Sequence, residues 1–231
     1  MSMNNMQELL KHELGDLLFA EKTILKALPK MAREVANPDM RTRMEQHVRE
    51  TEQQVTNLER AFEAIGERAK AEKCPGILGL VKEHDDFKRE ERPSKPILEA
   101  FDLGSGLRVE HYEIAAYRTA IAIARNLGLQ AVIDALQENL DQELAMAAFI
   151  ESAAPMALEA ARANSAAAEA RGASKRATKR ATKSASKSAS KGASKSASKS
   201  ASKGASKRGA AKKSTAKKSS AKKAAGKRST R

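Results

Sequence analysis

The most informative segment of the chain is Arg108-Val109-Glu110-His111-Tyr112-Glu113-Ile114-Ala115-Ala116-Tyr117. At helical spacing, one stripe through it carries Leu103, Leu107, Glu110, Ile114, Tyr117, Ile121 and Ala124. Every side chain of this stripe is apolar or aromatic except that of Glu110. A carboxylate on a core-facing stripe is costly unless a cation, a metal or a hydrogen-bond network compensates it. The segment therefore predicts an amphipathic helix that carries a carboxylate into the core.

Three other segments show related patterns. One stripe consists of Leu10, Leu14, Leu17, Glu21, Ile24, Leu28 and Met31, and another of Leu136, Leu140, Glu143, Ala147 and Ile150. Each has a single acidic interruption. The fourth segment carries His47, Glu50 and Gln53 on the flank of its apolar positions. Four amphipathic helices with inward carboxylates are typical of di-iron and di-manganese bundles.

The order of the segments predicts an all-α fold without strands. We expect long helices over about residues 4–36, 38–65, 97–127 and 129–153. Asn37 and Pro38 are a suitable N-cap and first residue for the second helix, and Gly66 and Gly128 are suitable stops. Residues 67–96, with a short helix near 77–87, are too long for a hairpin link. They predict a crossover between helices two and three of an antiparallel, ferritin-like four-helix bundle.

Charge divides the chain into two parts. Of its 43 Lys and Arg residues, 22 follow residue 164, where Glu169 is the one acidic residue. Because the whole chain carries +14, residues 165–231 carry about +21 and residues 1–164 about −7. We therefore predict a helical domain over 1–164 and a basic tail over 165–231.

Composition also bears on location. The single Cys74 excludes an internal disulfide and a cysteine-based zinc cluster. No uninterrupted apolar run approaches the ~20 residues of a membrane span, and the N-terminus lacks the pattern of a signal peptide. We expect a cytoplasmic, nucleoid-associated protein with no membrane partner.

The tail repeats Ala-Ser-Lys units every four residues and then Lys-Lys pairs every five. It contains no Leu, Ile, Val, Phe or Tyr, so we expect it to be disordered when alone. Its lysines are a candidate site for DNA or another polyanion: Lys175, Lys179, Lys183, Lys187, Lys191, Lys195, Lys199, Lys203, Lys207, Lys212, Lys213, Lys217, Lys218, Lys222 and Lys223. A purely solubilising tail, or one that binds the acidic domain, is the alternative. Its composition resembles the tails of linker histones.

The helical part resembles the YciE/YciF-type ferritin-like proteins. The motifs that carry the resemblance are Asp16-Leu17-Leu18-Phe19-Ala20-Glu21-Lys22, His47-x-x-Glu50-Thr51-x-x-Gln54, Glu110-His111-Tyr112-Glu113-Ile114-Ala115-x-Tyr117 and Leu140-x-x-Glu143. The resemblance covers about residues 4–160 and leaves the tail outside. It implies a ferritin-like bundle, usually dimeric, that is linked to bacterial stress responses and holds two metal ions between its helices.

The ligands carried over are Glu21, Glu50, Glu110 and Glu143, with His47 and Glu113 as further candidates. The ferritin-like pattern places Glu-x-x-His on helices two and four, where this chain has Gln53 and Met146. His47, one turn before Glu50, is a possible substitute for the missing imidazole. Oxygen ligands with some imidazole favour iron or manganese, so the expected cofactor is a pair of these ions.

Two functions remain open at this point. In the first, a homodimeric dimetal protein oxidises Fe(II) or consumes peroxide beside nucleic acid, to which its tail binds. In the second, the protein is not an enzyme but a nucleoid-associated protein. Its bundle is then a dimerisation scaffold, and the buried carboxylates pair with Arg or Lys.

Overall fold

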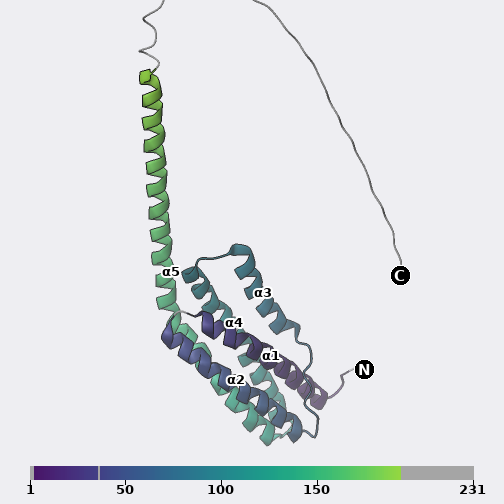
Figure 1. The fold of residues 1–231 in the computed structure, drawn as a ribbon. Coiled ribbons are helices and arrows are strands. Elements are labelled where there is room, and N and C mark those ends of the chain that lie inside the picture. Colours follow the sequence, from purple (N-terminus) through teal and green to yellow (C-terminus); the bar gives the residue numbers. More distant parts are fainter. Residues whose placement is uncertain (1–2, 36, 194–231) are drawn as a thin grey trace, which may run out of the picture. The chain divides into compact units, whose positions relative to one another are not determined.

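The computed structural model describes residues 3–35 and 37–193 and is all-helical (Figure 1). Its helices are α1 (Met6–Glu34), α2 (Pro38–Ala64), α3 (Pro75–Glu91), α4 (Lys95–Asn126) and α5 (Gln130–Ala193). No strand occurs within those two ranges, so the all-α prediction is confirmed for them.

The helix boundaries follow from local chemistry. Asn37 caps α2 as predicted, because its side-chain oxygen accepts hydrogen bonds from the backbone N–H groups of Asp39 (2.9 Å) and Met40 (3.1 Å). Pro38 is the first residue of that helix. Gly66 and Gly128 follow α2 and α4 with φ angles of +73° and +71°. Only glycine adopts this left-handed conformation readily, which explains both stops.

The connection between α2 and α4 contains α3, which is longer at both ends than the predicted 77–87. It packs against α4 and, to a smaller extent, against α1. Cys74, immediately before α3, is buried, and its Sγ lies 2.7 Å from the hydroxyl oxygen of Tyr112 on α4. The connection is therefore a packed part of the fold.

The apolar core consists of two clusters. The first joins residues such as Leu14, Leu58 and Leu136, from α1, α2 and α5, to the middle and end of α4. The second includes Ile24 and Met146 and extends to α3. The buried acidic residues of α1, α4 and α5, and the buried His47 and Gln54 of α2, lie between members of the two clusters, so the clusters enclose a polar layer.

The C-terminal helix differs from the sequence prediction. The pattern predicts the end of this helix near Ala153, then an alanine-rich stretch to about Ala168 that either extends the structure or leads into the tail, and disorder from Ser165. Instead, α5 continues through Pro155 to Ala193 and is 64 residues long. A proline removes one hydrogen bond from a helix, while the flanking alanines favour helix strongly. Helical hydrogen bonds close locally, so the lack of apolar residues after 165 does not prevent the helix.

Most of the proposed tail site lies beyond this helix. Lys175, Lys179 and Lys183 are exposed on α5, and Lys187 and Lys191 belong to the same helix. The other ten lysines, from Lys195 to Lys223, lie outside the described residues. The compact unit that contains the core ends at Lys175, and Arg176 begins a second unit. The domain boundary at 164/165 stays a prediction.

By length and composition alone, α5 is the one described helix that is long and apolar enough, within residues 130–183, to cross a membrane. A single helix of this kind is weak evidence, because helices from the cores of soluble proteins pass the same test. The absence of a membrane partner stays a prediction.

Candidate metal centre

The polar layer brings five predicted ligands together. Glu21 comes from α1, His47 from α2, Glu110 and Glu113 from α4 and Glu143 from α5. Their exposed fractions are 1%, 1%, 4%, 1% and 0%, respectively. Burial of four carboxyl groups this close together is costly unless protons or cations balance their charge.

These five side chains form two overlapping groups. One ligand atom each from His47, Glu110 and Glu143 lie within 4.8 Å of one another. The same limit holds for Glu21, Glu113 and Glu143. Glu143 is common to both groups. This spacing of residues over four helices matches what a dinuclear carboxylate site requires.

On α2, His47 is more deeply buried than the sequence predicted. His47, expected on the flank, is fully buried, and its Nε2 lies 3.6 Å from Oε1 of Glu110. Glu50, expected as a principal ligand, belongs to neither group, and Gln53 is exposed. Three residues cover about 60° less than a full helical turn. Glu50 and then Gln53 therefore lie progressively farther round the helix from the core-facing side.

Glu50 instead contacts Arg43 and His47. Its Oε2 accepts a hydrogen bond from Arg43 at 2.7 Å and lies 3.3 Å from Nδ1 of His47. Partial burial acts to raise the pKa of Glu50, but hydrogen bonds from His47, Arg43 and Gln46 lower it to about 2. A charged Glu50 orients the His47 ring, with Nε2 directed to the centre.

Among the described residues, no lysine or arginine pairs with the carboxylates of the centre. Within the described chain, Glu21, Glu110, Glu113 and Glu143 form no ion pair with a lysine or arginine. Buried oxygens Oε2 of Glu110, Oε1 of Glu113 and Oε2 of Glu143 accept no hydrogen bond there either. Unpartnered buried oxygens are rare in folded proteins. Such oxygens are available as ligands for a cation, so these residues fit iron or manganese.

The electrostatics lead to the same conclusion. Burial raises the pKa of Glu21, Glu110 and Glu113 well above 4.5, and the neighbouring carboxyl groups raise it further. Without a cation these groups therefore retain protons that exposed carboxyls lose. A divalent cation replaces those protons and favours the charged forms.

A polar network supports the centre, and the sequence analysis missed most of it. Gln54 donates a hydrogen bond to Glu143, and Tyr117, from the same stripe of α4 as Glu110, donates one to Glu21. Asn139 donates to the Tyr117 hydroxyl at 3.0 Å and to the backbone oxygen of Gln54 at 3.2 Å. Asn57 donates to Asn139 at 2.8 Å.

A signal for this network is present in the sequence. The buried face of α2 runs His47, Thr51, Gln54, Leu58, at alternating spacings of four and three. Continuing the alternating spacing of four and three residues from His47, instead of a constant spacing of three, predicts that Gln54 is buried. Met146, at the position of the ferritin-like histidine, lies in the second apolar cluster and supplies no polar ligand.

Comparisons with known proteins agree with this architecture. Residues 5–164 match the model of the family described as a domain of unknown function, DUF892. Protein YciF of Escherichia coli K12 is 30% identical over 146 residues, which are 63% of this chain and 87% of YciF. The match to the family ends where the basic tail begins.

Two solved structures are similar. YcfI of Rhodopseudomonas palustris is 37% identical with a TM-score of 0.63, covering 65% of this chain and 95% of YcfI. The E. coli stress protein YciF is 28% identical with a TM-score of 0.64, covering 68% of this chain and 99% of YciF.

Proposed function

The chain belongs to the DUF892 family, and from its buried carboxylates we propose that it is a ferritin-like stress-response protein with a dinuclear iron or manganese centre. The observation that carries the proposal is the pair of candidate groups that share Glu143 and whose carboxylates pair with no lysine or arginine among the described residues. In this proposal, α1, α2, α4 and the first part of α5 are the four helices of a ferritin-like bundle.

Each residue of the polar layer has its own role in this proposal. His47, Glu110 and Glu143 would hold one ion, and Glu21, Glu113 and Glu143 would hold the other. Gln54 and Tyr117 fix two of these carboxylates through hydrogen bonds, and Glu50 orients His47. Bound iron or manganese would supply redox chemistry, namely oxidation of Fe(II) or reduction of peroxide.

The basic tail gives the second half of the proposal. About 21 net positive charges after residue 164 favour phosphate contacts and counterion release, and the lack of aromatic residues there disfavours reading of bases. We propose that the tail binds nucleic acid without sequence preference, so that a homodimer holds its metal chemistry beside DNA. Two linked tails raise the avidity without additional interactions.

Metal content tests the proposal most directly. The full-length chain is loaded without oxygen with Fe(II) or Mn(II), dialysed, and analysed by mass spectrometry for ions per chain. We expect about two ions in the unchanged chain and fewer than about one in Glu143→Gln, because both groups lose their shared ligand. Oxidation of the bound Fe(II) by peroxide is then followed in the same samples.

The control variant is Glu151→Gln, on the same helix, with a side chain that is 60% exposed and outside both groups. It should retain the metal content of the unchanged chain. Absence of bound metal from the unchanged chain would overturn the dimetal proposal. The protein would then be a scaffold for its tail, with the buried carboxyl groups held neutral by protons.

A further inference from the structure

A cavity of about 520 Å³ lies beside the candidate metal centre. Its lining comes mostly from the C-terminal part of α1, the start of α2, the first half of α4 and residues 146–160 of α5. The lining includes Met156, which is 61% exposed, and Glu110, which is 4% exposed. Because Glu110 also belongs to one of the two candidate ligand groups, the cavity connects the surface with the centre.

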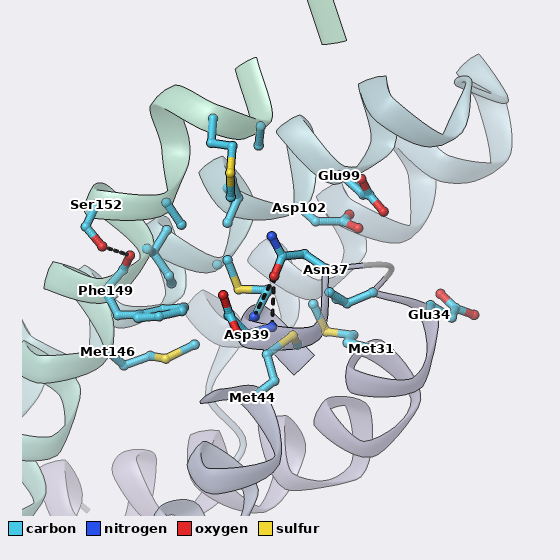
Figure 2. Close-up of a pocket in the computed structure, with 18 of the residues that line it drawn as sticks. Met31, Glu34, Asn37, Asp39, Met44, Glu99, Asp102, Met146, Phe149 and Ser152 are labelled. Carbon is cyan, nitrogen blue, oxygen red and sulfur yellow. Dashed lines mark hydrogen bonds between the residues drawn. The ribbon is translucent and has the colours of Figure 1, made fainter. Parts of the chain in front are cut away.

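Most of the side chains that line the cavity are apolar, and methionine is prominent among them. Met31, Met44, Met146 and Phe149 contribute to the lining, and Figure 2 shows their side chains gathered around the space. Organic ligands occupy cavities of about 300–1,000 Å³ with a mostly apolar lining. Hydrogen peroxide and dioxygen are far smaller than this cavity. Its size and lining therefore favour a molecule with an apolar organic body.

The charged residues of the lining favour a neutral ligand. No lysine or arginine of the described chain lines the cavity, so a carboxylate or phosphate on the ligand has no cationic partner there. The lining acids require no cationic ligand either. Glu34 accepts a hydrogen bond from Lys88 at 2.6 Å, and Asp102 lies 2.9 Å from Nε2 of His84. Asp39 lies in the first turn of α2, where the helix dipole stabilises a carboxylate.

Glu110 offers a polar contact in the buried part of the cavity. Its Oε1 lies 3.6 Å from Nε2 of His47, whereas its Oε2 accepts no hydrogen bond from the described residues. A buried oxygen without a partner is rare in folded proteins. A ligand with an O–H group at one end can donate to this oxygen while its apolar body lies against the methionines.

We propose that the cavity binds an organic hydroperoxide, R–O–OH, with its terminal O–H group donating a hydrogen bond to Glu110. This inference rests on the proposed function, because it names the class of peroxide that the centre consumes, but the binding itself requires no metal. Reduction breaks the O–O bond, and two electrons with two protons from solvent convert R–O–OH into R–OH and water. The two electrons are those released when two Fe(II) ions become Fe(III).

Binding is measured first and without metal, by calorimetric titration of the full-length chain after treatment with a chelator. The ligands are cumene hydroperoxide and its alcohol product, 2-phenylpropan-2-ol, and the methyl ether of that alcohol is the control without an O–H donor. We expect one molecule of hydroperoxide or alcohol per chain, bound about tenfold more tightly than the ether. Equal binding of alcohol and ether would overturn the hydrogen bond to the ligand.

Variants of Glu110 identify the acceptor of that hydrogen bond. Glu110→Leu should remove the preference for the alcohol over the ether, because the side chain no longer carries an oxygen. Glu110→Gln should retain the preference, since its amide oxygen accepts the same hydrogen bond. A preference that persists in Glu110→Leu would assign the contact to another residue and overturn the proposed pose.

A variant that fills the cavity assigns the binding to it. Gly106 lines the cavity, and a β-carbon there meets nothing closer than Cδ1 of Ile150 at 3.4 Å. Gly106→Leu should therefore weaken binding of the alcohol by at least about tenfold. Gly104→Leu is the matched control, because Gly104 is exposed on the same helix, lies outside the lining and has open space for a β-carbon.

Ala153→Phe, at another position of the lining, is a second filling variant. Circular dichroism shows which of these variants fold. Alcohol binding that survives both filling variants would overturn the site.

Oxidation of bound Fe(II) then tests the substrate class. In protein loaded without oxygen, Gly106→Leu should slow oxidation by cumene hydroperoxide at least about tenfold more than oxidation by hydrogen peroxide, which is small enough to pass the added side chain. Equal slowing of the two reactions would overturn the assignment to organic hydroperoxides.

The two proposals fail in different ways. A chain that binds about two metal ions but neither alcohol nor hydroperoxide would overturn this inference and leave the dimetal function intact. A chain that binds both ligands but no metal would support the cavity as their site and overturn the dimetal function. A dimer that binds no ligand and that Gly106→Leu dissociates in ultracentrifugation would overturn the ligand site in favour of a subunit interface.

Discussion

Gln54 on α2 donates a hydrogen bond to Oε1 of Glu143 on α5, although 89 residues separate the two in the sequence. Glu143 is the carboxylate common to both ligand groups, so Gln54 orients the side chain on which both depend. Both residues are completely buried. The supporting hydrogen bond is therefore shielded from competition by water.

Replacement of Gln54 should weaken metal binding without removing a proposed ligand. We expect Gln54→Leu to lower the affinity for Mn(II) by about 10–100-fold, the usual effect of removing a hydrogen-bond partner of a ligand. Competition titration with a fluorescent chelator measures it. Gln130→Leu is the control, since Gln130 is exposed on α5, its side chain donates a hydrogen bond only to Asp134 among the described residues, and its replacement should leave the affinity unchanged. Equal effects of the two variants would contradict a positioning role for Gln54.

The two tyrosines of α4 should respond differently to removal of their hydroxyl groups. Tyr117→Phe removes one buried hydrogen bond from each of Glu21 and Asn139, so we expect the unfolding free energy to fall by about 1–3 kcal/mol, with weaker metal binding. Tyr112→Phe removes only the interaction with Cys74, outside both ligand groups. It should leave the metal affinity intact. Urea unfolding and metal titration test both, and retained metal affinity in Tyr117→Phe would show that Tyr117 serves packing alone.

After treatment with a chelator, the protein should lose stability as pH rises. Burial and mutual proximity raise the pKa of Glu21, Glu110 and Glu113 well above 4.5 in the folded state. Their stabilising contribution is therefore complete below the unfolded value and is lost as pH rises through the raised values. The urea midpoint should fall as pH rises above about 5, less steeply in Glu113→Gln.

Added Mn(II) should reverse this loss, because the cation replaces the protons. Glu50 acts in the opposite sense. Its pKa is lowered to about 2, so its contribution is present above the unfolded value and is lost as pH falls toward 2. A urea midpoint of the chelated protein that does not change above about pH 5 would contradict the buried charge cluster.

Binding of duplex DNA should depend steeply on salt and little on sequence. Replacing Lys212, Lys213, Lys217, Lys218, Lys222 and Lys223 by Gln should reduce the slope of log K against log[salt] by up to about 0.9 for each phosphate that is no longer neutralised. Fluorescence anisotropy at several salt concentrations measures the slope. Replacing the exposed Lys26, Lys30 and Lys70 of the helical domain should leave it unchanged. An unaltered slope in the tail variant would assign binding to another surface.

The helices and their acidic interruptions could be predicted because they are local properties. The stripes through Glu21, Glu110 and Glu143 follow from helical periodicity, and all three residues are buried. The end of α5 could not be predicted in the same way. Alanine and lysine favour helix even without a core, whereas the prediction of disorder from residue 165 rests on the missing apolar residues.

Hydrophobic spacing and helical geometry together define which side of each helix is buried, and they suffice to place acidic groups on the core faces of three helices. They do not define which of these groups meet. Tertiary packing brings His47 together with Glu110 and Glu143, joins the two candidate groups at Glu143, and places Gln54 and Tyr117 in hydrogen bonds to their carboxylates. Contact between helices depends on their relative rotation and register, which the packing of all side chains together determines.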